Sequence, residues 1–103
     1  NYDALAGELL QSAALCDEGL WRMPLPDLYK DMLKAEYGDI KNIGGRAAGS
    51  ITAALFLSEF VEDGIPWAHC DVAGPTFLDK PMLHYTSGGT GQMVTSVSRW
   101  ICG

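Results

Sequence analysis

The chain has 103 residues, a length that suits one small domain with one hydrophobic core. Hydrophobic residues make up 48% of the sequence and charged residues 19%, which is typical of a globular chain and argues against disorder. The net charge is −6, from 7 basic and 13 acidic residues, and no run of Lys or Arg occurs. The sequence therefore lacks the basic footprint of a nucleic-acid partner, and it has no apolar stretch of about 20 residues that would predict a membrane span.

Two helices are predicted in the first third of the chain. Asp3 can cap a helix that runs to about Cys16, with apolar residues at helical spacing along one face. The next residues, 21–26, are expected to be extended because two prolines restrict the backbone. Pro26 suits the first turn of a second helix, and Gly38 is a natural residue to end it.

In the middle of the chain, the sequence pattern predicts a third helix between two strands. Residues 39–43 form a short possible strand, and a glycine turn then leads into a helix over residues 46–62. Apolar residues surround most of that helix, which predicts burial on several sides. Residues 65–73 give the best strand of the chain, and Gly74 and Pro75 end it.

A long irregular stretch is expected at residues 76–91, and a loop of that length is usually functional or covered. Thr90 or Gly91 then opens a last helix. The fold class is thus α/β, with about four helices and one or two strands, and a possible parallel strand–helix–strand unit at residues 39–73. A lone parallel pair is not a stable sheet, so the chain is expected to be a fragment of a larger mixed-sheet domain or to bury its apolar faces against a partner.

Three cysteines, Cys16, Cys70 and Cys102, are an odd number without C-x-x-C spacing, which fits a reducing compartment better than a disulfide framework. The first residues have no basic segment typical of a signal peptide. The chain also lacks an initiator Met, which indicates either trimming or a piece of a longer chain.

The glycine turn Gly44-Gly45-Arg46-Ala47-Ala48-Gly49-Ser50 nearly fits the phosphate-binding pattern G-x-x-x-x-G-K-[ST]. The required Lys is missing, because Ser50 occupies its position, so we expect no nucleotide site. The glycines are better explained by unusual backbone angles or close packing, and Gly49 is expected to let another element approach the helix.

Residue chemistry alone predicts no catalytic set. His69 and Asp71 could supply two metal ligands from one strand face, but a metal needs about three or four, and no other motif completes a set. His69 is therefore expected to be structural, and His84 to face solvent. Cys70 and His69 are adjacent in a predicted strand and point apart, which disfavours a Cys–His nucleophile pair.

Four motifs in order and in register carry a more specific signal. They are WRMPLPDLY at residues 21–29, DIKNIGGRAAGSITAALFLSEFV at residues 39–61, PWAHCDVAG at residues 66–74 and GGTG at residues 88–91, and the likeness around them covers nearly the whole chain, weakest before Trp21 and after Met93. This pattern resembles the C-terminal part of the catalytic domain in the leucyl aminopeptidase (cytosol aminopeptidase) family.

The resemblance implies a metallo-exopeptidase of the cytoplasm or of an organelle lumen or stroma that releases N-terminal residues, often Leu, from peptides. Two divalent metal ions, zinc or manganese, would bridge a water molecule and polarise the scissile carbonyl. The resemblance also implies a mixed sheet between helices and assembly into a homohexamer.

The same resemblance places the family's metal ligands and catalytic residues upstream of this chain. Asn1, Tyr2 and Asp3 look like the start of the family's N-T-D-A-E-G-R motif, but no Glu-Gly-Arg follows, so Asp3 is not assigned as a ligand. No catalytic or metal-binding residue is therefore expected in residues 1–103, which would be inactive alone and bind no metal. Residue by residue, the resemblance assigns Ala73 and Thr76 to the pocket for the first side chain of the substrate.

Two other functions remain open at this point. The chain could be a non-catalytic truncated paralogue that acts as an assembly or interaction module. The remaining possibility is a nucleotide-binding protein. It would require that ATP measurably protect the chain, and we expect no such protection.

Overall fold

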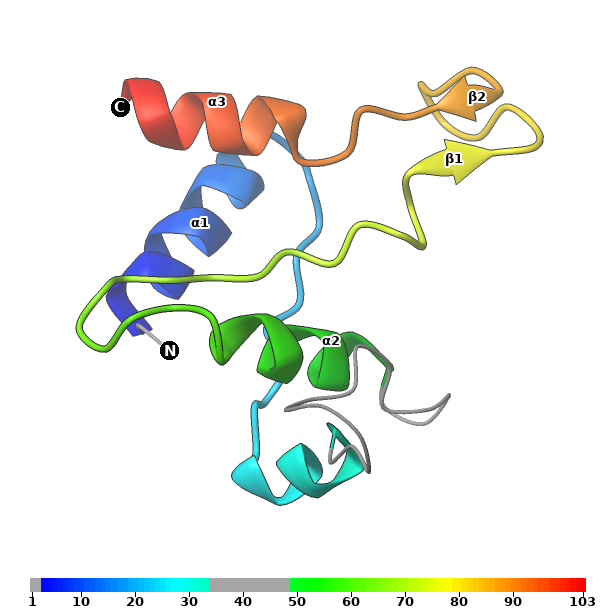
Figure 1. The fold of residues 1–103 in the computed structure, drawn as a ribbon. Coiled ribbons are helices and arrows are strands. Elements are labelled where there is room, and N and C mark those ends of the chain that lie inside the picture. Colours follow the sequence, from blue (N-terminus) through cyan, green and yellow to red (C-terminus); the bar gives the residue numbers. More distant parts are fainter. Residues whose placement is uncertain (1–2, 34–48) are drawn as a thin grey trace. The chain divides into compact units, whose positions relative to one another are not determined.

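The computed structural model describes residues 3–33 and 49–103 (Figure 1). Their elements in chain order are α1 (Asp3–Leu15), the 3-10 helix η1 (Asp27–Leu33), α2 (Gly49–Ser58), β1 (Phe77–Leu78), β2 (Gly88–Gly89) and α3 (Val94–Cys102). The chain divides into two compact units, one within residues 22–69 and the other made of residues 2–21 and 70–103. No helix in the described ranges is both long enough and apolar enough to span a membrane.

The first unit is built around η1 and α2. Its core consists of Leu33 from η1 and Ile51 and Leu55 from α2, with partly buried apolar side chains around them. η1 begins directly after Pro26, whose fixed φ suits the start of a helix and whose carbonyl accepts a hydrogen bond from the Tyr29 N–H at 3.0 Å. The predicted second helix is thus confirmed as a helical element, although its described part is a 3-10 helix rather than an α-helix.

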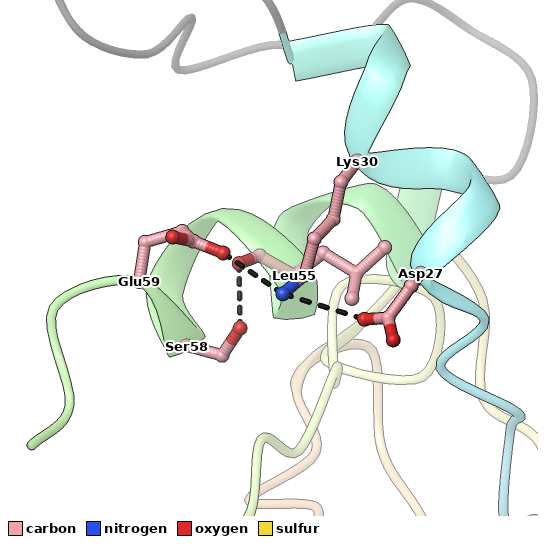
Figure 2. Close-up of polar contacts among 5 residues, drawn as sticks. All are labelled: Asp27, Lys30, Leu55, Ser58 and Glu59. Carbon is pink, nitrogen blue, oxygen red and sulfur yellow. Dashed lines mark hydrogen bonds and ion pairs between the residues drawn. The ribbon is translucent and has the colours of Figure 1, made fainter. Parts of the chain in front are cut away.

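An ion-pair cluster lies beside this core (Figure 2). The Lys30 Nζ is 3.2 Å from a Glu59 carboxylate oxygen and 3.3 Å from one of Asp27. The hydrogen bond to Glu59, followed by that to Asp27, raises the pKa of Lys30 above its ordinary value. The cluster therefore links η1 to the residue that follows α2.

Helix α2 ends earlier than predicted, and only one side of its described residues is buried. It ends at Ser58, where the Ser58 hydroxyl donates to the Leu55 carbonyl at 2.7 Å and the backbone continues in turns over residues 59–61. Leu57 and Phe60 remain 42% and 69% exposed, so the described part of this chain does not bury the segment on several sides. The expectation that a partner or the rest of a larger domain covers these faces stays a prediction. Predictions for residues 34–48, including the strand at 39–43, the glycine turn and the helix end at Gly38, lie outside the described residues.

The second unit contains α1 and α3 side by side (Figure 1). Leu9, Ser12 and Ala13 are the buried residues of α1, and Ser96, the buried residue of α3, has no exposed surface. The Ser12 hydroxyl donates a hydrogen bond of 2.7 Å to the Ser96 carbonyl. Helix α1 confirms the helix predicted from Asp3 to about Cys16.

The strand prediction for residues 65–73 is wrong. In the described part of the chain these residues form no strand, and the sheet there consists of β1 and β2 alone. These two pair antiparallel with Phe77 opposite Gly89 and Leu78 opposite Gly88. An alternating pattern indicates a strand only where a neighbouring strand can accept and donate its hydrogen bonds, and here the paired backbone lies in the stretch predicted to be irregular.

Candidate functional site

The residues predicted to line the substrate pocket, Ala73 and Thr76, stand at the two ends of one exposed turn at residues 73–76. Two local hydrogen bonds shape this turn. The Ala73 N–H donates to an Asp71 carboxylate oxygen at 3.0 Å, and the Thr76 hydroxyl donates to the Val72 carbonyl. The 73–76 turn therefore brings Ala73 and Thr76 together on one short piece of exposed backbone.

Thr90 joins this turn to the other arm of the hairpin. The Thr90 N–H donates to the Thr76 carbonyl at 2.8 Å, which continues the β1–β2 ladder by one residue. The Thr90 hydroxyl lies 2.6 Å from the Pro75 carbonyl oxygen and 3.2 Å from that of Thr76, and its oxygen accepts the Gln92 N–H at 3.2 Å. The GGTG motif thus contacts the turn after the PWAHCDVAG motif, a link between two motifs that sequence alone did not reveal.

A buried carboxylate holds the start of α3. Met93, the residue before the helix, has a left-handed backbone with φ of 73°, and its own side chain makes no capping hydrogen bond. Glu18, only 8% exposed, instead accepts the Met93 N–H at 3.0 Å, the Ser96 N–H at 3.1 Å and the Ser96 hydroxyl. One side chain from more than 70 residues away therefore caps α3, which begins at Val94 rather than at the predicted Thr90 or Gly91.

The histidines are found in aromatic contacts. The His69 ring stacks near Trp67 with centroids 6.4 Å apart, and the His84 ring lies 4.1 Å from that of Tyr85. Within residues 3–33 and 49–103, no three His, Cys, Asp or Glu side chains gather closely enough to hold a metal ion. The described residues alone therefore do not fit a metal centre.

The structure also bears on Cys70 as a possible nucleophile and on Gly49 as a site of close packing. Although Cys70 is exposed as a residue, partial burial of its thiol raises the pKa, which disfavours the thiolate that a nucleophile needs. A Cβ placed on Gly49 would meet no atom within 4 Å among the described residues, so the expected close packing at that glycine is not found.

Comparisons with known proteins give a consistent answer. Residues 1–98 match the model of the cytosol aminopeptidase family, catalytic domain. A probable cytosol aminopeptidase of Prochlorococcus marinus (strain MIT 9313) is 52% identical over 102 residues, which cover 99% of this chain and 21% of that protein.

Solved structures show the same similarity. The bottromycin maturation enzyme BotP, in complex with Mn, matches with a TM-score of 0.91 and 35% identity over 97% of this chain and 22% of BotP. A mutant of tomato leucine aminopeptidase matches with a TM-score of 0.86 and 37% identity over 97% of this chain and 19% of that enzyme. The chain spans about a fifth of the length of these relatives. It belongs to the cytosol aminopeptidase family, and its residues correspond to part of that family's catalytic domain.

Proposed function

We propose that residues 1–103 are the C-terminal part of the catalytic domain of an aminopeptidase that releases N-terminal residues, Leu among them, from peptides. The observation that carries the proposal is the match of residues 1–98 to the catalytic domain of the family. The four motifs in register support the same assignment. The names of the relatives support a cytoplasmic location, with an organelle lumen or stroma as the other possibility.

The proposed role of this chain is recognition of the first side chain of the substrate. Ala73 would leave room for an apolar side chain, and Thr76 would form the far edge of the pocket, since both belong to the exposed 73–76 turn. The local hydrogen bonds to the Asp71 carboxylate and to the Val72 carbonyl would hold the turn in one shape before substrate arrives. A preshaped turn favours binding because less conformational entropy is lost when the complex forms.

The cofactor and assembly proposals concern the full-length enzyme. Manganese is present in the structure of BotP, which supports a divalent metal, and we propose two zinc or manganese ions held by residues outside this chain. We further propose that the full-length protein assembles as a homohexamer and that residues 1–103 need the N-terminal portion of the domain for activity.

The test uses the full-length product of the gene that encodes this chain and, separately, the 103-residue chain. We expect the full-length protein to hydrolyse leucine p-nitroanilide after addition of Mn²⁺ or Zn²⁺ and to lose activity with a chelator. We expect no turnover by the 103-residue chain under the same conditions. Metal-dependent turnover by the short chain, or none by a folded full-length protein, would contradict the proposal.

A second function, a non-catalytic interaction module, is favoured by the exposed apolar side chains of the second unit. Leu83 is 89% exposed and Ile101 is 70% exposed. Large apolar side chains that are this exposed often mark a surface that contacts a partner. Light scattering on the 103-residue chain tests this alternative. A folded monomer at high concentration would count against it, and a defined oligomer would support it.

A further inference from the structure

We propose that Thr90 is a positioning residue that fixes the 73–76 turn in place and thereby sets selectivity for the first side chain of the substrate. The inference rests on the proposed role of Ala73 and Thr76 in substrate binding. The structural basis is that Thr90 contacts the backbone carbonyls of both residues at the end of the turn.

The hydrogen bonds within the turn fix its shape but not its place. Those of Ala73 and Thr76 reach only two and four residues along the chain. Thr90, by contrast, is 14 and 15 residues away from the two carbonyls that it contacts. Among the described residues, the hydrogen bonds that join the turn to the other arm of the hairpin therefore come from Thr90.

The side chain of Thr90 adds a contact that the backbone ladder does not make. The Thr90 N–H already serves the Thr76 carbonyl at 2.8 Å. The single hydroxyl proton is therefore best placed on the Pro75 carbonyl, whose oxygen is the nearer one at 2.6 Å. Removing the hydroxyl would release Pro75 while leaving the backbone pairing of Thr76 intact.

The hydroxyl oxygen also connects the turn to the helix pair. It accepts the Gln92 N–H at 3.2 Å, and the following residue, Met93, donates its own N–H to the buried Glu18 at 3.0 Å. Within the second unit, the 73–76 turn is thus connected to Glu18 through Thr90 and then through the neighbouring residues Gln92 and Met93. The turn is anchored to the part of this unit that is most deeply buried.

Two substitutions separate the hydroxyl from the rest of the side chain. Thr90→Val keeps the shape of the side chain and removes the hydrogen-bonding group, whereas Thr90→Ser keeps the hydroxyl and removes a methyl group. Thr86→Val is the matched control, because Thr86 is an exposed threonine on the same hairpin. All three would be made in the full-length gene product and compared on leucine and alanine p-nitroanilides with Mn²⁺.

We expect Thr90→Val to lower kcat/KM for the leucine substrate by about 5- to 10-fold, the effect of one hydrogen bond on placement. For the alanine substrate, kcat/KM should fall by only about 2-fold, because a small side chain reaches less far into the pocket. The ratio of kcat/KM for the leucine substrate to that for the alanine substrate should therefore fall. Thr90→Ser and Thr86→Val should stay within about 2-fold of wild type. Equal losses on both substrates would indicate a structural role only and would overturn the proposal, as would an unchanged Thr90→Val.

A second measurement keeps this test separate from that of the proposed function. Hydrogen exchange of a peptide covering residues 71–78 should be faster in Thr90→Val than in wild type, Thr90→Ser or Thr86→Val, while the peptide covering α1 is unchanged. If the full-length protein hydrolyses neither anilide, the proposed function fails and selectivity by this residue fails with it. Unchanged exchange at 71–78 would show that Thr90 does not position the turn, whatever the activity.

Discussion

Replacing Glu18 should destabilise the second unit more than any other single change to a charged residue in it. Glu18→Ala removes the acceptor for two backbone N–H groups at the start of α3 and for the Ser96 hydroxyl. Because Ser96 has no exposed surface, water cannot replace the lost partner without opening the packing between α1 and α3.

The magnitude follows from two contributions. Loss of a helix N-cap costs about 1 kcal/mol, and leaving a buried donor without an acceptor costs about 1–3 kcal/mol. We therefore expect Glu18→Ala to lower the free energy of unfolding by about 2–4 kcal/mol. Glu18→Gln should cost about half as much, because its amide oxygen can still accept one N–H while its NH₂ group faces the other donor.

Urea unfolding of the 103-residue chain, followed by circular dichroism at 222 nm, measures this difference. Glu8→Ala is the matched control, because Glu8 lies on α1 and accepts the Trp100 Nε1–H at 2.9 Å, but does so at the surface. We expect the control to cost less than about 0.5 kcal/mol. A Glu18→Ala variant within that range of Glu8→Ala would refute the claim that Glu18 holds α3.

Two further predictions concern the ion-pair cluster and the hairpin. The raised pKa of Lys30 means that the folded state favours its charged form, so its contribution is present below the ordinary value of 10.5 and is lost as the pH rises through the raised pKa. Since the side chains of Lys30, Asp27 and Glu59 are 46%, 88% and 37% exposed, Lys30→Met should cost under about 1 kcal/mol. Its difference from wild type in urea midpoint should shrink between pH 9 and 12, and a difference that grows would contradict this account. Leu83 is exposed and has φ of 55°, a left-handed backbone conformation that is unfavourable for a residue with a Cβ. Leu83→Gly should therefore raise the free energy of unfolding by about 0.5–1 kcal/mol. A lower melting temperature in that variant would show instead that the Leu83 side chain stabilises the hairpin.

Sequence reasoning succeeded where a signal was local. The helix from Asp3 shows its apolar spacing within four turns, and Pro26 marks the start of η1 in the same way. The four motifs pointed to the family because their order and spacing are specific, and the match over residues 1–98 confirms it. Ala73 and Thr76 came from that resemblance alone and stay predictions.

Sequence reasoning failed where a partner far along the chain decides the outcome. Residues 65–73 alternate like a strand but have no neighbouring strand in the described residues, and the pairing falls instead on Gly88 and Gly89, which have low strand propensity. Glu18 reads as a polar residue at a helix end, and nothing near it in sequence indicates that its carboxylate caps a helix beginning at Val94. Thr90 reads as a helix-start residue, whereas its hydroxyl contacts Pro75.

The contacts between α1 and α3 also determine when this unit can form during synthesis. The bonds from Ser12 to Ser96 and from Trp100 to Glu8 join residues 84 and 92 positions apart. Closing so long a loop costs conformational entropy, which is offset only when the contacts between the two helices form. Because α1 precedes α3 in the chain, α1 leaves the ribosome first and cannot pack against α3 until that helix has been synthesised. Leu9 and Ala13 on α1 are buried in the finished unit, and we expect them to stay more exposed until α3 packs against that helix, so that chaperones that bind apolar helices can reach them.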